Sequence, residues 1–165
     1  MTYYIGVPLI ILLALIEASV LPLFRIAGLQ PNLSLVVLVS WMMVRGQREA
    51  LALIPIAGIF IGLVDAAPMG AALLALAPIA LLYDLRQVHL GEGQFSLTVL
   101  FTLVATLVYE AVFLLVYIIY GDVGSIGSAL TRIVLPTALL NIAWAVPVYF
   151  LMWTFSADTR RAAFA

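Results

Sequence analysis

The hydrophobic positions of this chain form six long runs, separated by short connections that contain polar residues, glycine or proline. The runs lie at residues 3–24, 31–44, 50–66, 69–85, 95–120 and 130–155. A helix needs about 20 apolar residues to cross the hydrocarbon core of a bilayer. The pattern therefore predicts an all-α, polytopic membrane protein: a bundle of six transmembrane helices that forms a single integral membrane domain over residues 1–165.

The second and third runs are shorter than a typical span. They meet at Arg45, Arg48 and Glu49. Two interpretations are open: a pair of short spans across a locally thinned bilayer, or a re-entrant pair. A re-entrant pair would place these charges at membrane depth, where an arginine costs at least about 2.5 kcal/mol. We therefore expect two short spans.

Composition supports the membrane class and narrows the possible chemistry. The chain of 165 residues is 66% hydrophobic and only 9% charged, whereas soluble domains carry about 25% charged residues. Its net charge of -1 provides no basic surface for nucleic acid. Cysteine is absent, and the single histidine, His89, falls in a connection without acidic or cysteine companions at ligand spacing. We therefore expect no metal and no other cofactor.

The arginines define the orientation that we expect. With a cytoplasmic N-terminus, five arginines fall on the inside and two, Arg25 and Arg132, fall on the outside. This distribution follows the positive-inside rule, and both termini are then cytoplasmic. All connections between the runs are short. They leave no room for a soluble catalytic domain, which favours a non-enzymatic protein surrounded mainly by membrane lipid.

Several polar side chains fall within or beside the predicted spans. Glu17 and Glu110 lie at similar positions along the first and fifth runs, so a rise of about 1.5 Å per residue gives them one depth in the outer half of the membrane. We define an outer polar cluster whose candidate members are Glu17, Asp65, Glu110, Arg25, Arg132 and, from beneath, Asn141. One interpretation is an ion or ligand pathway. The other, which we favour, is that buried acids pair with an arginine, a hydroxyl or a partner chain.

Small residues recur at helical spacing in the third run and in the turn that follows it. Pairs four residues apart let helix backbones approach closely, and an acid before a Pro/Gly turn can accept hydrogen bonds from the N–H groups of that turn. The residues are Gly58, Gly62, Asp65, Pro68 and Gly70, together with the pair Ala14 and Ala18 on the first run. We expect them to serve helix packing and the docking of another membrane protein.

Aromatic residues near the ends of the runs are typical of interfacial belts. Tyr3, Tyr4 and Trp41 lie toward the predicted inner edge of the membrane, and Tyr117 and Tyr120 lie toward the outer edge. We therefore expect these rings to lie at the two membrane–water interfaces.

Three stretches carry a more specific signal. A Pro-Asn-Leu entry opens PNLSLVVLVSW (31–41), which is followed by Arg45. A glycine stripe, an acid and a Pro-x-Gly turn form the stretch 58–70. A proline and an asparagine precede the apolar exit of LPTALLNIAWAVPVYFL (135–151). Together these stretches resemble the second, third and last spans of MreD, the rod shape-determining membrane protein family of bacteria, with Asn32 where aspartate is commoner.

The resemblance to MreD implies a role that composition does not. Members of that family are non-enzymatic parts of the cell-elongation machinery in the bacterial inner (cytoplasmic) membrane, where they support peptidoglycan synthesis. They associate with MreC, a bitopic periplasmic scaffold protein, and act alongside MreB filaments, RodA and a class B penicillin-binding protein. The resemblance also implies a bundle similar to the substrate-binding subunits of energy-coupling-factor vitamin transporters.

Two other functions stay open. One is that of a substrate-binding subunit of an energy-coupling-factor vitamin transporter, which requires an outward pocket lined by side chains such as Glu17, Glu110 and Asn141. The other is that of a structural accessory subunit of a respiratory or photosynthetic complex. Short connections and few polar side chains count against the transporter, and the lack of a histidine within a predicted span counts against pigment binding.

Overall fold

The computed structural model describes residues 3–24, 28–64, 68, 70–81, 94–120 and 126–162. Every regular element in this part of the chain is a helix, which confirms the predicted all-α class. The elements are α1 (Tyr3–Ser19), η1 (Leu21–Phe24), α2 (Leu33–Arg45), α3 (Gln47–Val64), α4 (Ala71–Leu76), α6 (Gln94–Tyr120), α7 (Ile126–Ala129), η2 (Leu130–Val134) and α8 (Leu135–Ala162). Of these, η1 is a 3₁₀ helix and η2 is a π-helix. His89 lies outside the described residues.

The helices differ greatly in length. α2 has 13 residues and α6 has 27, so at about 1.5 Å per residue they are about 20 Å and about 40 Å long. Within the described residues, three helices are long and apolar enough to cross a membrane: Tyr4–Leu23, Phe95–Tyr120 and Ile126–Phe155. These helices indicate an integral membrane protein. That all six runs cross the bilayer stays a prediction.

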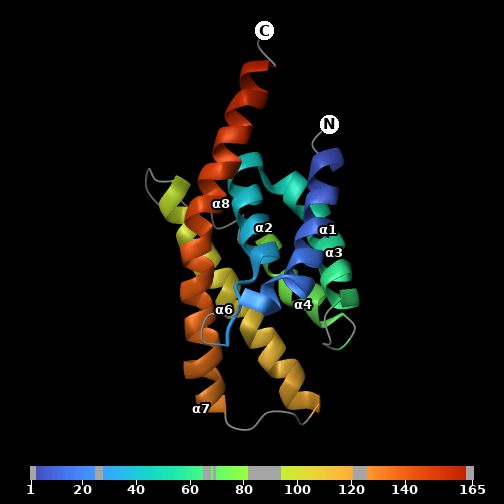
Figure 1. Ribbon diagram of the computed structural model, residues 1–165, viewed down its shortest axis with the longest axis vertical. Coiled ribbons are helices and arrows are strands. Elements are labelled where there is room, and N and C mark those ends of the chain that lie inside the picture. Colours follow the sequence, from blue (N-terminus) through green and yellow to red (C-terminus); the bar gives the residue numbers. More distant parts are fainter. Residues whose placement is uncertain are drawn as a thin grey trace.

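Both chain ends lie at the same end of the bundle, near the start of α1 and the end of α8 (Figure 1). We call this the terminal end. At the opposite end, which we call the distal end, α6 and the start of α8 extend beyond α1, α2, α3 and α4 (Figure 1). The bundle is therefore thick at the terminal end and consists mainly of two long helices at the distal end.

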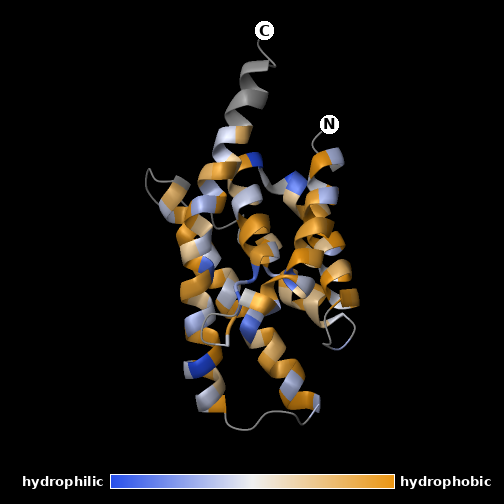
Figure 2. Ribbon diagram, in the orientation of Figure 1, coloured by the Kyte–Doolittle hydropathy of each residue, from blue (hydrophilic) through white to orange (hydrophobic). Residues whose placement is uncertain are grey.

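α2 is the central helix of the bundle. It packs against α1, α3, α6 and α8, and every residue from 34 to 44 is buried. Its sequence is mostly apolar on all sides, as is expected of a helix with neighbours all round. The hydrophilic residues that precede α2 lie in the middle of an otherwise hydrophobic bundle (Figure 2). Polar backbone groups therefore have to be satisfied there.

At the terminal end, a polar contact joins α2 to α3. Gly46, between the two helices, has a φ of 106°, which glycine adopts without strain. Trp41 Nε1 donates a hydrogen bond to Glu49 Oε2 at 3.1 Å, and the Arg45 guanidinium lies 5.0 Å from the centre of the Trp41 ring. Trp41 is only 2% exposed. The Trp41 ring therefore belongs to the core and does not face lipid, while its predicted depth at the inner interface stays a prediction.

α3 and α4 meet at the first glycine of the predicted small-residue stripe. A Cβ on Gly58 would lie 2.7 Å from Leu73 Cα, so glycine is needed for this close approach. A Cβ on Gly62 would have its nearest heavy atom, Gly70 N, at 3.9 Å, an ordinary van der Waals distance. Pro68 and Gly70 lie in the connection between the two helices, where Gly70 has a φ of 91°. Gly58 therefore serves packing within the chain.

Candidate functional site

α2 begins inside the bundle, and its first N–H groups have no preceding helical turn whose carbonyl groups could accept their hydrogen bonds. Water is scarce at such a depth in a membrane, and side chains have to supply the acceptors. Asn32 is the N-cap, and its Oδ1 accepts a hydrogen bond from Leu35 N at 2.8 Å. Glu17 Oε2 accepts two bonds from Ser34, one from its backbone N at 3.2 Å and one from its Oγ at 2.6 Å. The Glu17 carboxylate on α1 thus holds the start of α2.

Asn141 on α8 joins the start of α2 to α6. Its Oδ1 accepts a bond from Asn32 N at 2.8 Å, and its Nδ2 donates to Thr106 Oγ1 at 3.0 Å. Thr106 Oγ1 donates in turn to Thr102 O at 2.8 Å. Asn141 and Thr106 are both fully buried, so water does not compete for these bonds. We call this set the polar junction, with the members Glu17, Asn32, Ser34, Thr106 and Asn141.

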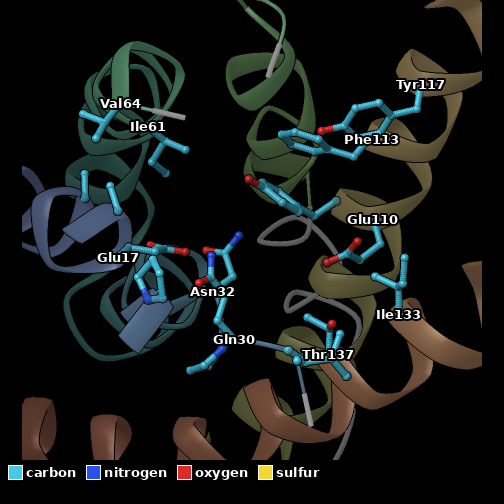
Figure 3. Close-up of a pocket in the computed structure, with 17 residues that line it drawn as sticks. Glu17, Gln30, Asn32, Ile61, Val64, Glu110, Phe113, Tyr117, Ile133 and Thr137 are labelled. Atoms are coloured by element: carbon cyan, nitrogen blue, oxygen red, sulfur yellow. The ribbon is translucent and has the colours of Figure 1, made fainter. Parts of the chain in front are cut away.

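A cavity of about 540 Å³ opens beside the polar junction. It lies where α1 and α3 end and α2 begins, while α6 and α8 continue on the far side (Figures 1 and 3). The unequal lengths of the helices are therefore the physical origin of this space. Its lining includes the acids Glu17 and Glu110 and the aromatic residues Tyr109, Phe113 and Tyr117.

Two carboxylates face the cavity from opposite walls, Glu17 from α1 and Glu110 from α6 (Figure 3). Their surroundings differ. Glu17 accepts the two bonds from Ser34, whereas Glu110 makes no hydrogen bond or ion pair within the described part of the chain. Gln30 also lines the cavity, and its buried Oε1 has no donor among the described residues. The cavity thus contains acceptors for which the described residues supply no donor.

An aromatic stripe runs along α6 beside Glu110. The ring centroids of Tyr109 and Phe113 lie 4.8 Å apart, those of Phe113 and Tyr117 lie 6.3 Å apart, and all three residues line the cavity. Tyr117 is predicted above at the membrane interface, while Tyr109 and Phe113 are not singled out there. The four-residue spacing of the three rings, which places them on one helical face, is the sequence signal that identifies this stripe.

The other predicted residues are distributed around this site. Arg132 on η2 is exposed and is not part of the cavity lining, and Arg25 and Asp65 lie outside the described residues. Ala14 is buried and Ala18 is exposed, but both border the cavity. As far as the structure describes the chain, the cavity lining therefore carries acidic side chains and no basic one.

A π-helical turn shapes the wall that leads into α8. Leu135 N donates to Leu130 O, five residues back. Pro136 follows directly and has no N–H to continue the regular pattern of bonds. Ile133 lies in this turn and lines the cavity. Single π-helical turns often occur at functional sites, and here the turn sets the edge of the candidate site.

Long apolar helices around a buried polar junction define an all-helical integral membrane protein. The family model of the rod shape-determining protein MreD matches residues 1–158 of the 165-residue chain. The chain belongs to the MreD family and is a rod shape-determining membrane protein. No curated protein and no solved structure gives a significant match, so the similarity to vitamin-transporter subunits stays a prediction.

Proposed function

We propose that the protein is a non-enzymatic subunit of the bacterial cell-elongation machinery. In this role it binds an MreC-like scaffold protein and thereby supports peptidoglycan synthesis during elongation. Membership of the MreD family supports this role. The same assembly contains MreB filaments, RodA and a class B penicillin-binding protein.

The proposed location is the bacterial inner membrane, with both termini in the cytoplasm. Two observations support this orientation: the chain ends share one end of the bundle (Figure 1), and five of the seven arginines fall on the cytoplasmic side when the N-terminus is inside. The distal end then faces the periplasm. The cavity lies toward that side, where a bitopic periplasmic scaffold protein can reach it.

The cavity is the proposed docking site for a membrane-proximal segment of the scaffold. Its position carries the proposal, because α6 and α8 leave about 540 Å³ uncovered beside the polar junction, and a partner segment would fill that space. The small-residue stripe on α3 is less suitable as a docking site for the scaffold. Gly58 is already packed against Leu73 of the same chain, which leaves mainly Gly62 for contact with a partner.

Site-specific photocrosslinking tests the docking site. A photoreactive amino acid replaces either Ile133, which lines the cavity and is 48% exposed, or Leu74 on α4, which is 63% exposed and is not part of the lining. Each full-length variant is produced together with the MreC-like protein of the same organism. We expect crosslinks to the scaffold from position 133 and none from position 74.

Two results would contradict the proposal. If the wild-type protein and the scaffold do not purify together, the partner is wrong. If position 74 crosslinks to the scaffold and position 133 does not, the docking site is wrong. Purification with a bound vitamin or with an ATPase pair would instead support the transporter function.

A further inference from the structure

Acidic side chains supply the charge in the described part of the cavity lining. Among the described residues, the lining contains the carboxylates of Glu17 and Glu110 and no basic side chain. Glu17 has donors in Ser34 and faces the positive N-terminal end of α2. Glu110 has no such donor within the described residues. A carboxylate held in an apolar environment without a cation or a donor is costly, so a bound cation would be most favourable at Glu110.

Aromatic side chains share the face of α6 on which Glu110 lies. Phe113 and Tyr117 follow Glu110 by three and seven residues, so they lie on the same side of α6. All three side chains line the cavity. Aromatic faces attract cations within about 6 Å, and the planar guanidinium of arginine stacks on them. A carboxylate and aromatic rings in one cavity lining are a combination that can bind an ammonium or guanidinium group.

We propose that the cavity binds a lysine or arginine side chain of the docking partner, with the charged group at Glu110 and the aliphatic stem along the apolar walls. This inference rests on the proposed function, because it names the chemistry by which the scaffold is recognised. Ile61, Val64 and Ile133 provide apolar lining for the stem. Gln30 Oε1, which lacks a donor within the described residues, is a further acceptor in the same lining.

Other cations fit this lining less well. A phosphatidylethanolamine headgroup carries a phosphate, which the negative charge of Glu110 would repel. Calcium takes about six to eight oxygen ligands, and no group of three or more His, Cys, Asp or Glu side chains suited to a metal occurs in the described parts of the chain. A lysine or arginine side chain has one positive charge and an apolar stem, and unlike a phospholipid headgroup it has no negatively charged group.

The affinity for the scaffold tests this inference. Glu110→Gln preserves the size of the side chain and removes its charge. With the full-length protein in nanodiscs, we expect the Kd for the MreC-like protein to rise about 30-fold, because the loss of one member of a buried charge pair leaves the other uncompensated. Glu49→Gln is the matched control at the terminal end, where glutamine can still accept the bond from Trp41. We expect the Kd of that control to equal the wild-type Kd.

Two further variants separate charge from shape. Glu110→Asp retains the carboxylate and should bind much more tightly than Glu110→Gln. Glu110→Lys should abolish binding. Replacement of one basic residue in the membrane-proximal segment of the scaffold by glutamate should then restore it. Each lysine and arginine of that segment is exchanged in turn, and the restoring position identifies the recognised side chain.

Several outcomes would overturn the inference. Equal Kd values for the wild type and Glu110→Gln would show that the charge is not recognised, although binding of the wild type would still support the proposed function. The same conclusion follows if no exchange in the scaffold restores binding to Glu110→Lys. If the effect of Glu110→Gln disappears in nanodiscs of phosphatidylglycerol alone, the bound cation is a lipid headgroup. If the wild type itself does not bind the scaffold, the proposed function fails and the inference fails with it.

Discussion

The contact between α3 and α4 and the polar junction hold the bundle together in different ways. Between α3 and α4, the two helices are in close contact. Gly58 lies so near Leu73 that a Cβ would not fit. At the polar junction, α1, α2 and α3 end or begin beside a cavity. There, hydrogen bonds centred on Asn141 connect the helices.

This difference follows from the fact that lipid is the solvent. Apolar helices in a bilayer gain little from burying apolar surface against each other, so they associate through close packing and through hydrogen bonds. A helix that begins inside the bundle needs acceptors for its first N–H groups. The early start of α2 therefore requires the polar junction, and it also leaves the cavity. We expect the contact between α3 and α4 to be sensitive to added volume and the polar junction to be sensitive to lost acceptors.

Removal of the Asn141 amide should have the largest effect on stability. Asn141→Leu eliminates two hydrogen bonds and leaves the buried Asn32 N–H without its acceptor. We expect the free energy of unfolding to fall by about 2–3 kcal/mol, because an orphaned buried donor alone costs about 1–3 kcal/mol. Thermal unfolding in detergent, followed by circular dichroism, measures this loss.

Thr106→Val is the matched control for the polar junction. It removes the acceptor of Asn141 Nδ2 and the local bond that Thr106 Oγ1 donates to Thr102 O. It preserves the shape of the side chain and leaves the bond between Asn141 and Asn32 in place. We expect a loss of about 1 kcal/mol. A larger loss for Thr106→Val than for Asn141→Leu would contradict the central position of Asn141 in the junction.

A methyl group at Gly58 should disturb the contact between α3 and α4, and the same group at Gly62 should not. In Gly58→Ala the new Cβ would lie 2.7 Å from Leu73 Cα, so a backbone has to move, and such overpacking costs about 1–3 kcal/mol. In Gly62→Ala the nearest heavy atom would be 3.9 Å away, and alanine favours the helix. The two unfolding midpoints are compared in one detergent. Equal midpoints would show that the contact between α3 and α4 is loose.

The helices could be predicted from the sequence for a simple physical reason. A long apolar run in lipid has to satisfy its backbone internally, and a single chain segment does so as a helix. Counting residues along each run also predicts one depth for Glu17 and Glu110. Both acids line one cavity, while their depth in the membrane stays a prediction and the function assigned to that position stays a proposal.

The direction in which side chains face could not be predicted in the same way. Core and lipid are both apolar, so hydrophobicity does not show which face of a membrane helix turns inward. Trp41 illustrates this limit, since an aromatic residue near the end of a run fits an interface and a core equally well. Its contacts with Glu49 and Arg45 exist only in the folded chain. For the same reason, the sequence does not reveal that Ser34 supplies donors to Glu17.

Substitutions of the two acids that line the cavity should have the smallest effects on stability. They also test most selectively whether Glu17 belongs to the polar junction and Glu110 does not. Glu17→Gln should lower the free energy of unfolding by about 1 kcal/mol, because it weakens charge-assisted bonds to Ser34 and the attraction to the N-terminus of α2. Glu110→Gln breaks no bond within the described residues and removes a charge from an apolar environment. Its stability should therefore equal or exceed that of the wild type.

Both variants are unfolded thermally in the same detergent, beside the wild type. An equal loss of stability in the two variants would mean that the two walls of the cavity are electrostatically alike. Glu110 would then not stand out from Glu17 as the group that binds a cation. If only Glu17→Gln is destabilised, the two carboxylates have separate roles: one holds α2 in place and the other faces the cavity without a donor among the described residues. Weaker binding of the scaffold by Glu110→Gln could then not be attributed to a less stable fold.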